Sequence, residues 1–61
     1  MTNTILLFAV YTAKHGYHHF ACEPFKDGKN AFEQAIAYVQ TDYNDPADKP
    51  RLYLLSEIPM N

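Results

Sequence analysis

The chain has 61 residues and a formal net charge of −2. A chain this short forms one domain and buries only about 60% of its unfolded surface on folding. The mild acidity argues against direct nucleic-acid binding, which normally requires a basic face. The single cysteine, Cys22, excludes an intrachain disulfide and favours a reducing compartment.

Residues 4–12 are predicted to form the first β-strand. Every residue from Ile5 to Tyr11 is apolar, whereas a strand with one wet face alternates apolar and polar residues. The run therefore predicts a central strand whose outer face is at least partly covered. It is far shorter than the roughly 20 residues of a membrane span, and no basic residue precedes it as in a signal peptide. We therefore expect a cytoplasmic protein.

A tight turn and a second strand are predicted next. Residues 13–16 have the composition of a hairpin turn, in which Gly16 takes a positive φ. Residues 17–23 return as the second strand. Pro24 follows at once, and proline is tolerated at strand ends and on edge strands, so this strand is expected at a sheet edge.

A polar connection over residues 25–29 is predicted to lead into a helix over about residues 30–42. Asn30 is a favourable N-cap, and Glu33 completes a capping-box pair with it. An apolar stripe at helical spacing is expected to face the sheet. It consists of Phe32, Ala35, Ile36, Val39 and Tyr43.

Residues 44–50 form a polar loop bounded by proline, and residues 51–58 are predicted as the third strand, ended by Pro59. Strict alternation assigns one face of this strand to Leu52, Leu54, Ser56 and Ile58. It assigns the other face to Tyr53, Leu55 and Glu57.

Together these elements predict an α+β fold, a single ββαβ unit that occupies residues 1–61 as one small domain. The three strands are expected to form an antiparallel sheet in the order 2-1-3, with the helix packed on one face. One helix cannot cover both faces of a sheet. Surplus apolar surface is therefore expected, and such surface often marks an interaction site.

Metal binding and catalysis are not expected. Zinc sites use four ligands, often in pairs at short spacing, but His18 and Cys22 lie too far apart on one extended strand, and His19 points to the opposite face. A cysteine nucleophile needs a base and a pocket, which a unit this small does not offer. We expect Cys22 to be a small buried hydrophobe and the protein to be a non-enzyme without a cofactor.

Two sets of residues are candidates for binding a partner. The acids Asp42, Asp45 and Asp48 do not have the spacing of a calcium loop. They are either a solvated helix exit and turn or part of an acidic face for a basic protein. The second set, which is either core or interface, consists of Tyr11, Tyr17 and Tyr53.

Three stretches share their order and pattern with a known family: FAVYTAKHGYHHFACEPF, NAFEQAIAYVQTDY and RLYLLSEIP. In this architecture the chain resembles the small bacteriophage inhibitors of host RNA polymerase. The resemblance implies a ββαβ plan and polymerase contacts through arginines of the last strand and acids near the hairpin and helix. Here Arg51 opens the last strand, and Glu23 is the acid nearest the second strand.

We therefore expect a phage-type inhibitor that blocks a bacterial host protein complex, with RNA polymerase as the first target. The alternatives are a counter-defence inhibitor of a CRISPR effector and a homodimeric interaction module. No nucleic-acid or membrane partner is expected. The expected partner surface joins the acidic loop to the hairpin, and its residues are Asp42, Asp45, Asp48, Tyr17, His15, His19, Tyr53 and Arg51.

Overall fold

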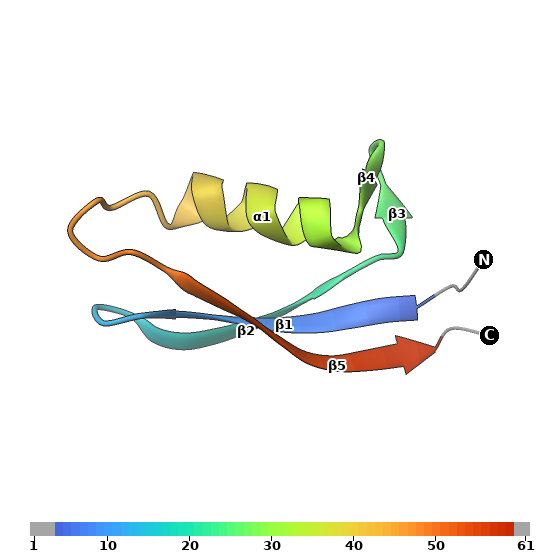
Figure 1. The fold of residues 1–61 in the computed structure, drawn as a ribbon, viewed down its shortest axis with the longest axis horizontal. Coiled ribbons are helices and arrows are strands. Elements are labelled where there is room, and N and C mark those ends of the chain that lie inside the picture. Colours follow the sequence, from blue (N-terminus) through green and yellow to red (C-terminus); the bar gives the residue numbers. More distant parts are fainter. Residues whose placement is uncertain (1–3, 60–61) are drawn as a thin grey trace.

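The computed structural model describes residues 4–59 and confirms the α+β architecture. Its elements are β1 (Thr4–Thr12), β2 (Gly16–Cys22), β3 (Phe25–Lys26), β4 (Lys29–Asn30), α1 (Ala31–Asp42) and β5 (Arg51–Pro59). The main sheet is antiparallel with the order β2-β1-β5, so the first strand is central as predicted. Figure 1 shows α1 along one side of this sheet, with no described element on the other.

The strand boundaries differ slightly from the predicted ones. Gly16 belongs to β2 because it forms the last rung of the hairpin, opposite Thr12, with a φ of 73°. Pro59 belongs to β5 and lies opposite Thr4. Proline is accepted there because β5 is an edge strand.

The polar connection over residues 25–29 is itself a small hairpin, formed by β3 and β4. Asp27 and Gly28 both have positive φ, at 52° and 78°, which is the requirement of the tightest hairpin turns and explains the Asp-Gly pair. The side chain of Gln34 ties this hairpin to α1, because its Nε2 donates to the carbonyls of Glu23 and Lys29. The hairpin thus carries the chain from the sheet to the helix layer (Figure 1).

The N-terminus of α1 is the predicted capping box. The Asn30 side chain accepts a hydrogen bond from the Glu33 backbone N–H at 2.9 Å. The Glu33 carboxylate accepts one from the Asn30 N–H at 3.0 Å. Because Asn30 has extended backbone angles and serves as the cap, the helix begins one residue later than predicted, at Ala31.

The core lies between α1 and the helix side of β1 and β2, and it is small. Its buried members are Leu6, Phe8, Val10, Cys22, Ala31 and Ala35. The predicted helix stripe is only partly correct, since Phe32 and Ile36 are 52% and 49% exposed. The small side chains of Ala31 and Ala35 make the close approach instead. The ring of Phe32 still packs edge-on against Phe8, with centroids 5.7 Å apart.

A β-bulge reverses the predicted alternation of β5. Leu7 lies opposite Ser56, but Phe8 lies opposite Leu54, so Leu55 is an extra residue without a direct partner. An extra residue shifts every later side chain to the other face. Ser56 and Ile58 therefore share the helix-free face with Tyr53, while Glu57 joins Leu52 and Leu54 on the helix side.

Candidate interaction surfaces

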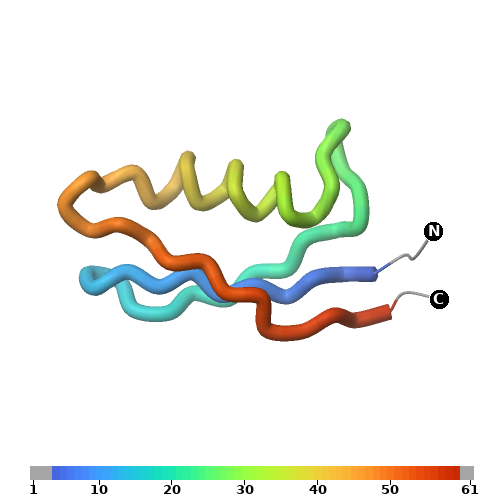
Figure 2. The backbone as a smooth tube through the Cα atoms, viewed as in Figure 1, coloured from blue at the N-terminus to red at the C-terminus, as the bar shows by residue number. Residues whose placement is uncertain are grey.

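The hairpin turn over residues 13–16 and the loop over residues 43–50 meet at one end of the molecule, the hairpin end (Figure 2). The carboxylate of Asp48 joins them. Its Oδ1 accepts the Ala13 N–H at 2.9 Å, and its Oδ2 accepts the Lys14 N–H at 2.8 Å. Both oxygens are used within the chain, so Asp48 has a structural role and is a poor candidate for a partner contact.

The other two acids of the loop region remain exposed. Asp45 organises the turn that presents Asp48, because its Oδ1 accepts the Ala47 N–H at 2.9 Å and its carbonyl accepts the Asp48 N–H at 3.2 Å. Asp42 is the last residue of α1. Asp42 and Asp45 thus supply the accessible negative charge of this loop.

Aromatic and histidine rings gather beside this loop on the helix side. The Tyr43 ring centroid lies 6.3 Å from that of His15 and 6.2 Å from that of His18. The two histidine rings are 6.4 Å apart. A hydrogen bond with Tyr43 raises the pKa of Tyr38, and partial burial and the charge of Asp42 act in the same direction. The sequence predicted Tyr43 in the apolar stripe of the helix and did not predict its contact with the hairpin histidines.

The helix-free face is the side of the main sheet turned away from α1. Its residues, from the strand register, are Ile5, Leu7, Ala9 and Tyr11 on β1, Tyr17, His19 and Ala21 on β2, and Arg51, Tyr53, Ser56 and Ile58 on β5. The three tyrosines of the second candidate set come together on this face from three different strands. Tyr17 lies 4.7 Å from Tyr11 and 6.3 Å from Tyr53 between ring centroids.

The chemistry of the helix-free face differs from that of the rest of the molecule. It contains no acid, and Arg51 carries its formal charge at neutral pH. The acids of the described chain lie in the turns and loops, on α1, directly after β2 in the case of Glu23, and on the helix side of β5 in the case of Glu57. The charge is therefore segregated between an acidic remainder and an apolar, weakly basic sheet face.

The predicted partner residues fall on these two adjoining surfaces. Tyr17, His19, Arg51 and Tyr53 lie on the helix-free face. His15 lies in the hairpin turn, next to the loop that contains the acids. The prediction missed Leu7 and Ile58 on the helix-free face. The apolar residues on both faces of β1 were a signal for Leu7, whereas the bulge hid Ile58.

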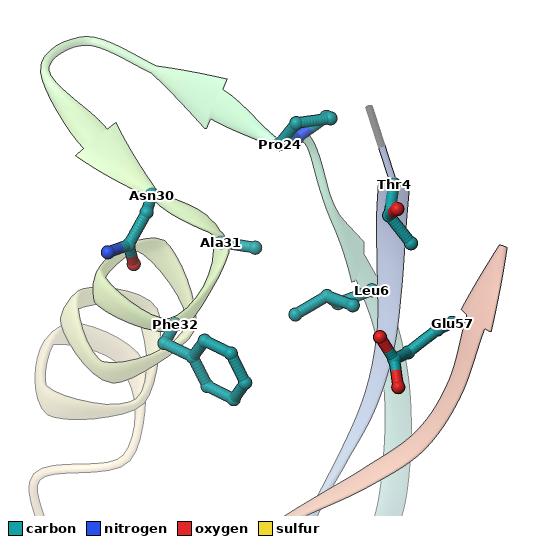
Figure 3. A pocket seen from close by; sticks show the side chains of 7 residues that line it. All are labelled: Thr4, Leu6, Pro24, Asn30, Ala31, Phe32 and Glu57. Carbon is teal, nitrogen blue, oxygen red and sulfur yellow. The ribbon is translucent and has the colours of Figure 1, made fainter. Parts of the chain in front are cut away.

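A shallow pocket of about 250 Å³ lies far from the hairpin end, where β1 begins and α1 begins. Its lining residues are Thr4, Leu6, Pro24, Asn30, Ala31, Phe32 and Glu57. In Figure 3 the Phe32 ring and the Glu57 carboxylate stand on opposite sides, with Leu6 between them. The lining holds no histidine, cysteine or lysine, and the capping box engages Asn30.

Cys22 is buried at 6% exposure, as predicted, and burial raises the pKa of its thiol. The protonated form, which is a poor nucleophile, is thereby favoured. Within residues 4–59, no three His, Cys, Asp or Glu side chains are grouped so that they could hold a metal ion. The helix of the described chain is too short and too polar to cross a membrane.

Comparison with known proteins gives no relative. No protein-family model matches the chain, no curated protein matches it, and no solved structure matches it.

Proposed function

We propose that this protein is a small inhibitory binding protein, of the kind encoded by phages, that acts in the host cytoplasm by occupying a surface of a bacterial protein complex. The observation that carries the proposal is the amount of large apolar side chain left uncovered. The exposed residues are Tyr17, Phe25, Phe32, Ile36, Tyr38, Tyr53, Leu54, Leu55 and Ile58. Apolar surface of this extent on a small protein is typical of an interaction site.

Binding suits this molecule better than catalysis. Enzyme sites are usually concave pockets with a few convergent polar groups, and the pocket beside Phe32 and Glu57 is shallow and lined by neither histidine, cysteine nor lysine. The thiol of Cys22 is buried. A surface that excludes a competing partner needs no such machinery.

The hairpin end is the surface proposed to meet the target. Asp42 and Asp45 present negative charge there, beside the rings of His15 and Tyr43. Tyr38, one of the exposed large residues, lies next to Tyr43, with ring centroids 5.9 Å apart. Acidic residues of this kind accelerate association with a basic protein surface and select against acidic ones. Bacterial RNA polymerase is the first candidate target. That choice rests on the resemblance in the order of elements.

Transcription by purified bacterial RNA polymerase tests the proposal in the presence of increasing amounts of the protein. We expect inhibition that saturates at one protein per polymerase. Asp45→Asn should weaken inhibition by about threefold to tenfold by removing one charge from the hairpin end, while the asparagine keeps an oxygen for the Ala47 N–H.

Asp27→Asn is the matched control, because it removes one charge from the turn of the small β3–β4 hairpin, and it should leave inhibition unchanged. Full transcription at millimolar protein would exclude the polymerase as target. An equal effect of the two variants would exclude the hairpin end as the contact surface. Inhibition of a purified CRISPR effector in place of the polymerase would keep the inhibitor class and replace the target.

A further inference from the structure

We propose that the helix-free face is also the contact surface between two copies of this chain, which pack it against itself as a symmetric dimer. This inference does not depend on the proposed target, because the hairpin end remains open in such a dimer. The sizes of the residues on this face indicate a second copy as the partner. When the order of rows is reversed, large residues of one copy meet small residues of the other.

The pattern is visible in two neighbouring rows across the strands. One row is Ala21, Leu7 and Ser56, which reads small, large, small from β2 to β5. The next row is His19, Ala9 and Tyr53, which reads large, small, large. Ala9 itself is 2% exposed, so the fit lies in the two outer strands, where the small residues Ala21 and Ser56 stand beside the large residues His19 and Tyr53.

A twofold axis in the interface plane and perpendicular to the strands brings these rows together. It reverses the order of rows and keeps each strand opposite its own copy. Tyr53 then faces Ser56 of the second copy, and His19 faces Ala21; both small residues are exposed. In an isologous contact of this kind each residue pair occurs twice, once in each direction, which is the usual arrangement in homodimers.

An axis parallel to the strands gives a poorer fit. It places Leu7 on Leu7 and Tyr53 on His19 of the second copy, and it leaves Ser56 opposite Ala21. Large residues then collide while small ones leave gaps, and close-packed interfaces tolerate neither. The perpendicular axis is therefore the one that the residues of this face favour.

The charges of the face also fit the perpendicular axis. Arg51 would face Ile58 of the second copy, and the two Arg51 side chains would lie at opposite ends of the interface. The long arginine stem covers apolar surface while its guanidinium reaches water at the rim. No acid lies within the three strands of the face; the nearest is the exposed Glu23, directly after β2 at the end of that edge strand.

The area of the helix-free face gives the expected affinity of the dimer. The nine residues of β1, at about 3.4 Å per residue, and three strands about 4.8 Å apart give a rectangle of roughly 400 Å² per copy. Two copies thus bury roughly 800 Å², about two thirds of the lower limit of the range of about 1,200–2,000 Å² of stable interfaces. We therefore expect a reversible dimer that forms in the micromolar to millimolar range.

Sedimentation equilibrium of the full chain over that concentration range tests for the dimer. The apparent mass should rise from the monomer value of 7.0 kDa towards twice that value. A mass that stays at 7.0 kDa up to millimolar concentration would overturn the proposal. It would leave the proposed inhibition untouched, since a monomer can still bind a target through the hairpin end.

Substitutions of two isoleucines test the face. Ile58 and Ile36 are 47% and 49% exposed, but Ile58 lies on the helix-free face and Ile36 on α1. Ile58→Lys should raise the dimer dissociation constant by about tenfold, because it faces Arg51 of the second copy. Ile36→Lys should leave it unchanged. The reverse result would place the contact elsewhere and overturn the proposal.

Charge reversal tests the axis. Ile58→Glu would form an ion pair with Arg51 of the second copy twice per dimer, so it should dimerise at least as well as the natural chain, whereas Ile58→Lys should not. Packed sheets are rotated by roughly 30° relative to each other, and the Arg51 side chain is long enough to reach the introduced glutamate despite this rotation. Equal weakening by Glu and Lys would contradict the perpendicular axis. Circular dichroism of each variant confirms that it is folded, and Ser56→Lys, at the centre of the face, replaces Ile58→Lys if that variant unfolds.

Discussion

The two faces of β1 have nearly the same composition but differ in how far they are buried. On one face Leu6, Phe8 and Val10 are 7%, 1% and 0% exposed. On the other, Leu7 and Tyr11 stay partly open, and Ala9 is covered by its neighbours on the same sheet. The difference comes from α1, which lies on one side (Figure 1). Apolar residues thus become core or surface according to what the rest of the chain can place over them.

This contrast divides the molecule into a folding face and a free face. The helix side supplies the buried contacts, chiefly through Phe8, which stacks on Phe20 and meets Phe32 edge-on. The helix-free face contributes less burial to the single chain. It is therefore the part of the molecule where substitution should change association more than folding.

The largest expected effect comes from breaking the helix side. Phe8→Ala should destabilise the fold by about 3–5 kcal/mol, which is comparable with the whole free energy of unfolding of so small a domain. Leu7→Ala, its neighbour on the helix-free face, should cost about 1 kcal/mol, because the Leu7 side chain buries less apolar surface on folding. Urea unfolding monitored by circular dichroism measures both, at low concentration to keep the chain monomeric. Equal costs would mean that the two faces do not differ.

A smaller effect is expected at the hairpin end. Asp48→Ala leaves the Ala13 and Lys14 N–H groups without their acceptor, at a cost of about 1–2 kcal/mol. Asp45→Ala removes one local hydrogen bond and should cost about half as much or less. Thermal unfolding of the two variants gives the comparison. A larger loss for Asp45→Ala would show that Asp48 does not anchor the turn.

The capping box gives the next effect. Asn30→Ala should cost about 1 kcal/mol, because the Glu33 N–H loses its acceptor. Asn44→Ala, in the exposed loop, is the control and should change stability by less than about 0.5 kcal/mol. The same unfolding assay applies. If the two asparagine variants were indistinguishable, the cap would not stabilise α1.

The smallest effect concerns Cys22. Burial raises the pKa of its thiol in the folded chain, so the unfolded chain releases this proton at lower pH. The stability from the protonated thiol is complete below the ordinary thiol pKa and is lost as pH rises through the raised pKa. Cys22→Ala should show a shallower loss of stability over this alkaline range, measured by unfolding at several pH values. An identical pH dependence in both chains would contradict the burial of the thiol.

Local pattern was enough to predict the elements, their order and the position of the central strand. The capping box of Asn30 and Glu33 and the turn at Gly16 depend on neighbours in sequence, so the residues themselves reveal them. The bulge at Leu55 could not be predicted, because it depends on the register between β1 and β5. The structural role of Asp48 depends on a contact with residues 35 and 34 positions away in sequence.

The orientation of α1 was hidden for a similar reason. Phe32 and Ile36 fit an apolar stripe, but the helix makes its sheet contacts with β1 and β2, so small residues face the sheet and these two project to the side. Of the candidate surface, Tyr53 and Arg51 could be predicted because they precede the bulge in β5, and Tyr17 because β2 pairs regularly with β1. Ile58 could not, because the bulge reverses its face.

The most direct measurement is a series of ¹⁵N–¹H correlation spectra of the labelled chain from low micromolar to millimolar concentration. The account predicts concentration-dependent shifts that cluster on the helix-free face, at Leu7, Tyr53, Ser56 and Ile58, with α1 unaffected. Shifts that cluster on α1 around Phe32 and Ile36, or spectra that do not change with concentration, would contradict it.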